Sequence, residues 1–213
     1  DYYSDNIREI GDKIYFDFHT PTEEINDFEW EIPGIHNVEN ATVAIAILHN
    51  LGVDFETLKQ GIANFKGIKR RYTKHRFENG KIYIDDYAHH PTELNAVIGS
   101  IKTFYPEKKL LVVFQPHLFS RTRDFADGFA ESLEKADELI LLNIYPAREL
   151  QENFEGVTSS WLSEKINLET REVSTLEDAF SRIKEKNFDV LLTVGAGNID
   201  TLYDGIVEWL SGK

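Results

Sequence analysis

Apolar and polar residues follow two different patterns along the chain. Near the N-terminus, the aromatic runs KIYFDFHT (13–20) and FEWEIPG (28–34) are bounded by glycine and proline, and they predict short strands. Residues 36–52 then place apolar side chains at helical spacing, and residues 54–65 do so again with Asp54 as the expected N-cap. This part of the chain is therefore expected to consist of strands followed by two helices.

Beyond residue 71 the pattern is that of an α/β domain. Residues 71–86 predict two strands about an Asn79-Gly80 turn, a strong hairpin signal. The second of these covers 82–86, and apolar runs predict further strands at 109–115, 138–145 and 189–196. Amphipathic segments predict helices at 91–105, 122–135, 157–166, 176–186 and 199–210. Because strands of this kind are buried on both faces, we expect a Rossmann-like, mainly parallel sheet with helices on both sides. The expected domains are 1–70 and 71–213.

Composition excludes several classes of protein. The net charge of −14 opposes non-specific binding to nucleic acid, and no apolar run in the 213 residues approaches the roughly eighteen that a membrane span needs. The absence of cysteine excludes disulfides and thiolate chemistry, and a cytoplasmic protein is expected. The chain contains no methionine, even at position 1, so it is expected to be a piece of a longer protein.

Unusual polar segments follow four of the predicted strands. These segments are DDYAHHP, QPHLFSRTR, NIYPARE and VGAGNI. In open α/β sheets, ligands bind where the carboxyl ends of the strands meet the N-termini of helices. We therefore expect the four segments to form one shared site.

The segment DDYAHHPTE allows three interpretations. Pro91 suits the first turn of a helix, so the segment could be only an N-terminal cap. His89 and His90 could bind a metal with the aspartates, but adjacent residues point apart, and no metal site is expected. An aspartate at the end of a strand can instead accept hydrogen bonds from ribose hydroxyls, and this interpretation is favoured.

Arg121 stands at the start of a predicted helix, where a cation opposes the helix dipole. It therefore requires a partner. That partner could be Asp124 or Asp127, or it could be a phosphate or carboxylate ligand, which we favour, with His117 placed to join it.

Two further segments remain ambiguous. Asn37 could be only a helix cap, whereas Asn40 is a weak helix former whose amide could bind an adenine edge. The glycines of VGAGNI could serve a ligand or only close packing.

Taken in order, six segments resemble the C-terminal half of the Mur ligases. The segments are GIHNVENA, FKGIKRRY, DDYAHHPTE, QPHLFSRTR, IYPARE and VGAGNI, and the resemblance covers nearly the whole chain. It implies an ATP- and Mg²⁺-dependent ligase of peptidoglycan synthesis that joins L-alanine to UDP-N-acetylmuramate through an acyl phosphate. Residues 1–70 would be the tail of a central P-loop ATPase domain, and residues 71–213 would be the Rossmann-like ligase domain.

The resemblance also implies roles for individual residues. The nucleotide would be held by His36, Asn37, Asn40, Arg71 and Asp86, with Asp86 on the ribose. The substrate would be held by Tyr87, His89, His90, His117 and Arg121. Of these, His117 and Arg121 are expected to be catalytic.

The chain departs from the family pattern in two places. It contains no G-x-x-x-x-G-K-[ST] motif, so the lysine that grips the triphosphate and the magnesium ligands are expected upstream, and the chain alone should not catalyse ligation. Leu118 stands where the family often has a basic residue. Three alternatives are a murein-peptide recycling ligase that adds a tripeptide to the same sugar, a non-catalytic nucleotide-binding module, and a metal-dependent hydrolase.

Overall fold

The computed structural model describes residues 1–11, 13–32 and 34–212. The chain divides into two compact units between Lys69 and Arg70, and each unit is described by itself. We call them unit 1 and unit 2. Pro33, at the end of the second predicted strand, lies outside the described residues.

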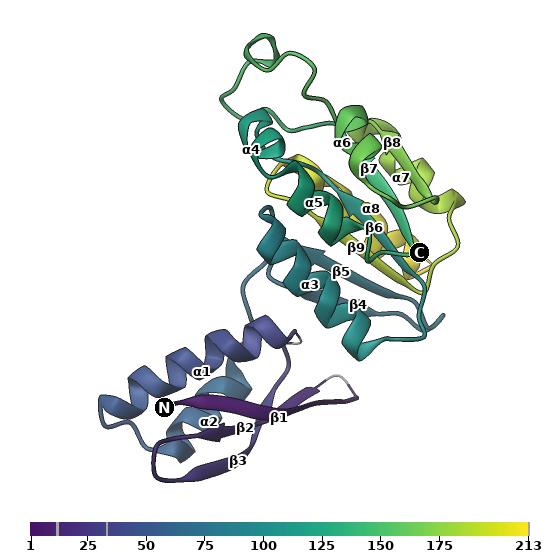
Figure 1. The fold of residues 1–213 in the computed structure, drawn as a ribbon. Helices are drawn as coiled ribbons and strands as arrows, with labels where there is room; N and C mark the ends of the chain where they lie inside the picture. The colour runs from purple at the N-terminus through teal and green to yellow at the C-terminus, as the bar shows by residue number, and fades with distance from the viewer. Residues whose placement is uncertain (12, 33, 213) are drawn as a thin grey trace. The chain divides into compact units, whose positions relative to one another are not determined.

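Unit 1 is a three-stranded antiparallel sheet with two helices (Figure 1). The sheet has the order β1 (Tyr3–Ile10), β2 (Lys13–His19) and β3 (Glu24–Trp30). Helices α1 (Ile35–Asn50) and α2 (Phe55–Asn64) follow, and the side chain of Asp54 caps α2 by accepting from the amide of Thr57. The two helices and strand β2 agree with the sequence patterns, whereas β3 lies four residues before the strand expected at 28–34.

The sequence patterns did not predict β1. Its eight residues, YSDNIREI, are half exposed or exposed, and its register with β2 shifts between Asp5 and Arg8. Polar, irregular strands at the edge of a sheet lack the alternation that identifies strands from sequence.

Unit 2 is built on a six-stranded sheet with the order β4-β5-β9-β6-β7-β8. The strands are β4 (Thr73–Arg76), β5 (Ile82–Asp86), β6 (Leu110–Phe114), β7 (Glu138–Leu142), β8 (Arg171–Ser174) and β9 (Val190–Val194). Only the pair β4 and β5 is antiparallel, as expected for the Asn79-Gly80 hairpin. The sheet is therefore mixed but mostly parallel.

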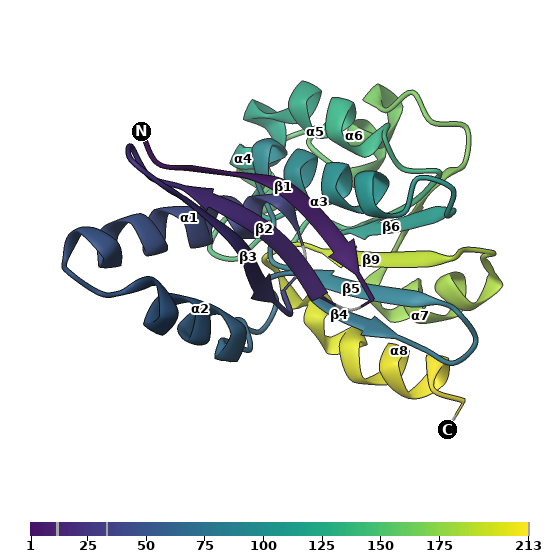
Figure 2. The same ribbon diagram turned by 90° about the horizontal axis from the view of Figure 1, so that it is seen from below.

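Helices cover both faces of this sheet (Figure 2). One face is covered by α3 (Pro91–Phe104), α5 (Ala126–Leu133) and α6 (Ser159–Lys165). These helices pack against Ile82 and Ile84 of β5 and their neighbours in the sheet. On the other face, α7 (Leu176–Glu185) and α8 (Tyr203–Leu210) pack against Tyr83 and its neighbours. The predicted Rossmann-like α/β fold is confirmed.

Three local features differ from the sequence patterns. The helix expected at 122–135 is two helices, α4 (Phe119–Asp124) and α5, which meet at Phe125. The segment expected as a helix from residue 199 begins as a 3₁₀ turn, Asn198–Leu202. Strand β8 was not predicted, because it is short and mostly exposed at the edge of the sheet.

None of the helices in the described parts of the chain is long and apolar enough to span a membrane.

Candidate functional site

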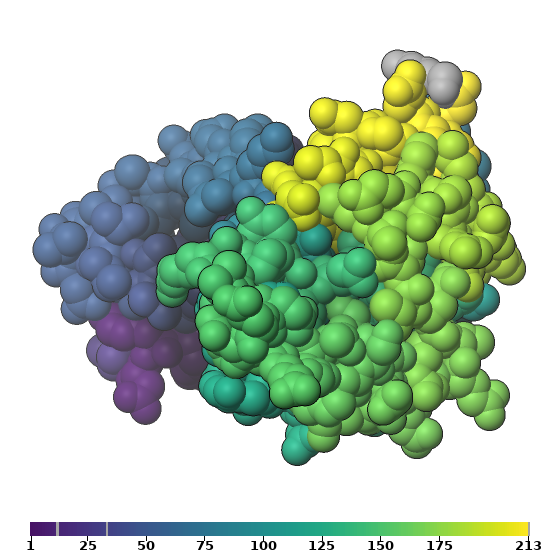
Figure 3. Space-filling model, turned by 90° about the horizontal axis from the view of Figure 1, so that it is seen from above, coloured from purple at the N-terminus to yellow at the C-terminus, as the bar shows by residue number. Residues whose placement is uncertain are grey.

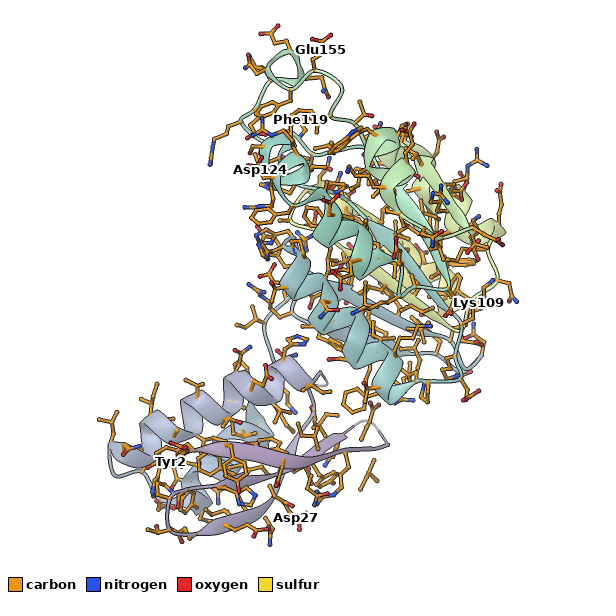
Figure 4. All side chains as sticks on the ribbon, viewed as in Figure 1. Tyr2, Asp27, Lys109, Phe119, Asp124 and Glu155 are labelled. Atoms are coloured by element: carbon orange, nitrogen blue, oxygen red, sulfur yellow. The ribbon has the colours of Figure 1, made fainter. Side chains whose placement is uncertain are left out.

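The four polar segments that follow strands lie at the carboxyl edge of the parallel sheet. Strands β5, β6, β7 and β9 end at Asp86, Phe114, Leu142 and Val194. Figure 4 labels Phe119 and Asp124 of α4 at this end of unit 2, and Lys109, which precedes β6, at the opposite end. Backbone hydrogen bonds connect the segments directly, since the amide of Gly195 donates to Asp86 (3.2 Å) and that of Tyr145 donates to Pro116 (2.8 Å).

The segment DDYAHHPTE leads into the start of helix α3. His90 is the N-cap and accepts from the amide of Thr92 through Nδ1 (3.3 Å), while Glu93 Oε2 accepts from the amides of His89 (2.9 Å) and His90 (3.1 Å). This reciprocal arrangement is a capping box. The ring of His90 also packs against Phe125, with centroids 4.6 Å apart. His90 therefore has a structural task that the cap interpretation anticipated.

Asp86 is held by the backbone. Its two carboxylate oxygens accept from the amides of Tyr72 (2.7 Å) and Ala88 (2.8 Å), and the residue is 3% exposed. Burial raises the pKa of Asp86, whereas the hydrogen bonds from Ala88 and Tyr72 act in the opposite direction. Asp86 thus ties the end of β5 to the start of the β4 hairpin.

The sequence patterns did not single out Arg70, which the structure places at the centre of a buried polar cluster. Its guanidinium lies near the carboxylates of Asp85 (3.7 Å) and Asp200 (3.4 Å), and it donates to the carbonyl of Gly195. Asp85 also accepts from the hydroxyl of Thr193 (2.8 Å). Arg70 therefore joins the ends of β5 and β9.

Arg70 and Arg71 both lie over the ring of Tyr87. Their guanidinium carbons are 5.0 and 5.7 Å from the ring centroid, and Arg71 is exposed whereas Arg70 is largely buried. Such distances are typical of cation–π contacts. Two adjacent arginines thus do different things: Arg70 holds the loops together, and Arg71 remains accessible beside Tyr87.

The glycines of VGAGNI allow close packing against Gln115. A Cβ at Gly195, which has a φ of 146°, would lie 2.6 Å from the carbonyl oxygen of Gln115. The side chain of Gln115 then accepts from the amide of Ile199 (2.9 Å) and donates to Asn198 (2.8 Å). The packing interpretation accounts for this loop.

His117 lies among aromatic rings and cations. Its ring stacks on Tyr145 (5.7 Å between centroids) and lies edge-on to His89 (6.2 Å). Burial lowers the pKa of His117, and the positive charges of Arg121, His89 and Arg148 lower it further. The neutral imidazole therefore dominates near pH 7. Because Arg121 Nη1 donates to Nδ1 (3.4 Å), the proton of that imidazole lies on Nε2, where it can be donated to an anion.

Arg121 does not pair with either aspartate considered from the sequence. Asp124 pairs with Arg123 (2.8 Å), and Asp127 pairs with Lys165 (3.0 Å). Among the residues that the structure describes, Arg121 has no carboxylate partner, and His117 is its neighbour. The pair Arg121–His117 is therefore a half-buried cation and a neutral donor at the carboxyl edge of the sheet.

The nucleotide residues expected in unit 1 lie on α1. The N-cap of α1 is Gly34, with a φ of 107°, so the suggestion that Asn37 is the cap was wrong. Asn37 is 8% exposed, His36 is half buried, and Asn40 is exposed on a groove of about 530 Å³ between α1 and α2. Arg71, Asp86 and the substrate residues belong to unit 2.

Within the described residues, no group of three or more histidine, aspartate or glutamate side chains is arranged to hold a metal ion. Asp85 and Asp86 are occupied by different partners, Thr193 and two backbone amides. The arrangement offers arginine and imidazole donors, which suit an oxyanion.

Residues 70–197 match the family described as Mur ligase, glutamate ligase domain. The chain belongs to the Mur ligase family. It is 45% identical to the UDP-N-acetylmuramate–L-alanine ligase of Flavobacterium johnsoniae over 97% of its own length and 45% of that protein. The chain thus spans less than half the length of this curated Mur ligase relative.

Two solved structures of Mur ligases have the same fold. The chain is similar to UDP-N-acetylmuramate–alanine ligase from Thermotoga maritima, with a TM-score of 0.78 and 24% identity, over all of this chain and 46% of that one. It is also similar to a murein peptide ligase from Psychrobacter arcticus, with a TM-score of 0.61 and 23% identity, over all of this chain and 45% of that one. At these identities the likeness concerns the fold.

Proposed function

We propose that this chain is the C-terminal part of an ATP-dependent ligase that joins L-alanine to UDP-N-acetylmuramate in the cytoplasm, as part of peptidoglycan synthesis. The observation that carries the proposal is the pair Arg121–His117, a cation without a carboxylate partner among the described residues beside a neutral imidazole. Such a pair suits the carboxylate of an amino acid or the charge of an acyl phosphate. The likeness to the relative from F. johnsoniae supports the choice of substrates.

In the proposed reaction, ATP supplies the phosphoryl group that converts the lactyl carboxylate of the sugar into an acyl phosphate. The amine of L-alanine then attacks the acyl carbon, the amide bond forms and phosphate leaves. Negative charge develops on the acyl oxygen and on the leaving phosphate. Arg121 and the Nε2 proton of His117 would stabilise this charge, with Tyr87 and His89 lining the same edge and His90 fixing the start of α3.

Residues 1–70 would be the tail of the ATPase domain and residues 71–213 the ligase domain. In unit 1, Asn37 and Asn40 would hold the adenine and His36 would also bind the nucleotide. In unit 2, Arg71 and Asp86 would hold the ribose and nearby atoms. The exposed guanidinium of Arg71 beside Tyr87 suits an anionic ligand. Asp86 is fixed by two amides, so any contact with ribose would use its remaining lone pairs. No magnesium ligand is assigned among these residues.

The test joins this chain to the part of the F. johnsoniae ligase that it does not cover. With UDP-N-acetylmuramate, ATP and Mg²⁺, phosphate release should depend on L-alanine, and mass spectrometry should detect the alanyl product. Arg121→Ala should lower kcat/KM by at least about tenfold, or 1.4 kcal/mol, without lowering the melting temperature. Arg123→Ala is the matched control on the same helix, and its effect on activity should be small.

Three outcomes would contradict the proposal. A folded chimera that prefers a tripeptide to L-alanine would be a recycling ligase. One that binds ATP but releases no phosphate would support a nucleotide-binding module. Hydrolysis that requires a metal but no ATP would support a hydrolase.

A further inference from the structure

Arg148 lies in the loop that follows β7. The proposed function gives this residue no role. Figure 3 looks onto this end of unit 2, where the green residues after β7 are at the surface. The loop is fixed first at Tyr145, whose amide donates to Pro116 (2.8 Å) and whose carbonyl accepts from the amide of Leu118 (2.9 Å). The Tyr145 ring stacks on His117. This end of the loop is therefore attached to the segment that carries His117.

The loop is fixed a second time at Glu149. Its carboxylate accepts from both the amide (3.0 Å) and the hydroxyl of Ser120. Burial opposes the ionisation of Glu149, but the hydrogen bonds from Ser120 and from the amide of Phe119, together with the charge of Arg148, outweigh it and lower the pKa. Glu149 thus occupies the first amides of α4, so an anionic ligand would have to be bound by side chains.

Arg148 stands between these two attachments. The turn Pro146–Glu149 is closed by a hydrogen bond from the amide of Glu149 to the carbonyl of Pro146 (2.9 Å), with Ala147 at a φ of 50°. The Arg148 side chain is exposed, and it forms no ion pair within the part of the chain that the structure describes. Its charge and that of Arg121 both act on His117.

Two arginines near one neutral imidazole repel each other, and an anion between them removes this repulsion. The charge of Arg148 acts on the neighbouring Glu149, but the oxygens of that carboxylate accept from Ser120. Arg123 and Lys165 of the same region each form an ion pair, whereas Arg121 and Arg148 form none among the described residues. We propose that Arg148 is a second binding residue of the Arg121–His117 site, where it contacts a carboxylate or phosphoryl oxyanion, and that Glu149 positions it. This inference rests on the proposed function only for the identity of that oxyanion.

The test titrates the 213-residue chain with two probes, inorganic phosphate and L-alanine, by NMR. Arg148→Gln and Arg121→Gln should each weaken binding of the same probe by about tenfold or more, as expected for a lost charged hydrogen bond. Arg123→Gln, on the same helix but paired with Asp124, should bind as the wild type does. The probe whose affinity falls identifies the oxyanion as a phosphate or as an amino-acid carboxylate.

The His117 ring gives a second measurement that does not depend on ligand. The groups whose charges act on it are Arg121, His89, Arg148 and Glu149. Removing the charge of Arg148 should raise the pKa of His117 toward the usual value of 6.5, and Glu149→Gln should change both this pKa and the anion affinity because the loop is released.

Two results would overturn the proposal: a wild-type chain that binds neither probe, or an Arg148→Gln variant that binds both as the wild type does. Neither result would change the activity expected of the ligase chimera. Conversely, an inactive chimera together with Arg148-dependent anion binding would overturn the proposed function and leave this site standing.

Discussion

At the scale of single residues, the function of a polar side chain depends on partners that lie far away in the sequence. An N-terminal cap before Pro91 was visible in the sequence because its members are neighbours, and in the structure it is a capping box. The partners of Arg121 could not be derived, since Asp124 and Asp127 are near in sequence but pair with other cations. Arg70 was missed because its partners, Gly195 and Asp200, lie more than a hundred residues away.

Replacement of Asp86 should reduce stability, because its buried carboxylate is the acceptor for two backbone amides. Asp86→Ala leaves the buried amides of Tyr72 and Ala88 without acceptors, which should lower the free energy of unfolding by about 1–3 kcal/mol per group. Urea denaturation measures this loss. Asp124→Ala is the control, because its exposed ion pair with Arg123 should contribute at most about 1 kcal/mol. Equal losses in both variants would show that Asp86 does not hold the β4 hairpin.

His75 should make unit 2 sensitive to mild acid. Its imidazole lies 2.5 Å from the hydroxyl of Tyr203, and burial lowers its pKa below the usual value of 6.5. As the pH falls below about 6.5, the unfolded chain binds a proton that the folded unit does not, so stability falls by up to about 1.4 kcal/mol per pH unit until the folded pKa is reached.

The variant His75→Gln removes the imidazole that binds this proton. The difference in unfolding free energy between wild type and variant should therefore be largest above pH 6.5 and shrink in acid, while the contributions of all other groups cancel. Denaturant titrations at several pH values measure the difference. If it stayed constant across this range, His75 would titrate alike in the folded and unfolded states.

At the scale of elements, the carboxyl edge is shaped by backbone conformations that the sequence does not display. Leu118 and Ala147 have φ values of 70° and 50°, which L-residues rarely adopt, and both flank the contacts between His117 and Tyr145. Left-handed backbone at non-glycine residues costs free energy and clusters at functional sites. The helix predicted at 122–135 begins earlier because the turn at Leu118 sets its start, and it is interrupted at Phe125.

Ala147→Gly should relieve this strain. A left-handed alanine costs about 1–2 kcal/mol, and glycine adds about 0.5–1 kcal/mol of unfolded-state entropy, so the variant should be neutral or more stable by up to about 1.5 kcal/mol. The same change at Ala96, within helix α3, should instead cost about 1 kcal/mol. Denaturation curves compare the two. If Ala147→Gly lost as much as Ala96→Gly, the turn would not be strained.

At the scale of the whole molecule, the fold of unit 2 was the most predictable feature. Strands such as LLVVF and VLLTV are apolar on both sides because helices cover both faces of the sheet. Few other folds produce this sequence pattern. The order of the strands could not be derived, because it depends on which helices cross over the sheet. The edge strands β1 and β8 escaped prediction because their residues are polar or exposed and lack a continuous apolar run.

The two units should differ in stability. Unit 2 buries two apolar clusters, one on each face of its sheet, and the central strands β5, β6 and β9 are completely buried. Unit 1 has a single small sheet, and between its helices an apolar groove lined by exposed residues such as Leu48 and Phe65 is open to solvent. Less apolar surface removed from water means less free energy to oppose local opening. In hydrogen exchange, amides of β6 and β9 should therefore be the most protected, and amides of β2 and β3 should exchange through openings of lower free energy. If β2 and β3 proved better protected than β6 and β9, the core of this chain would lie in unit 1, and the boundary near Arg70 would not separate a weaker from a stronger unit.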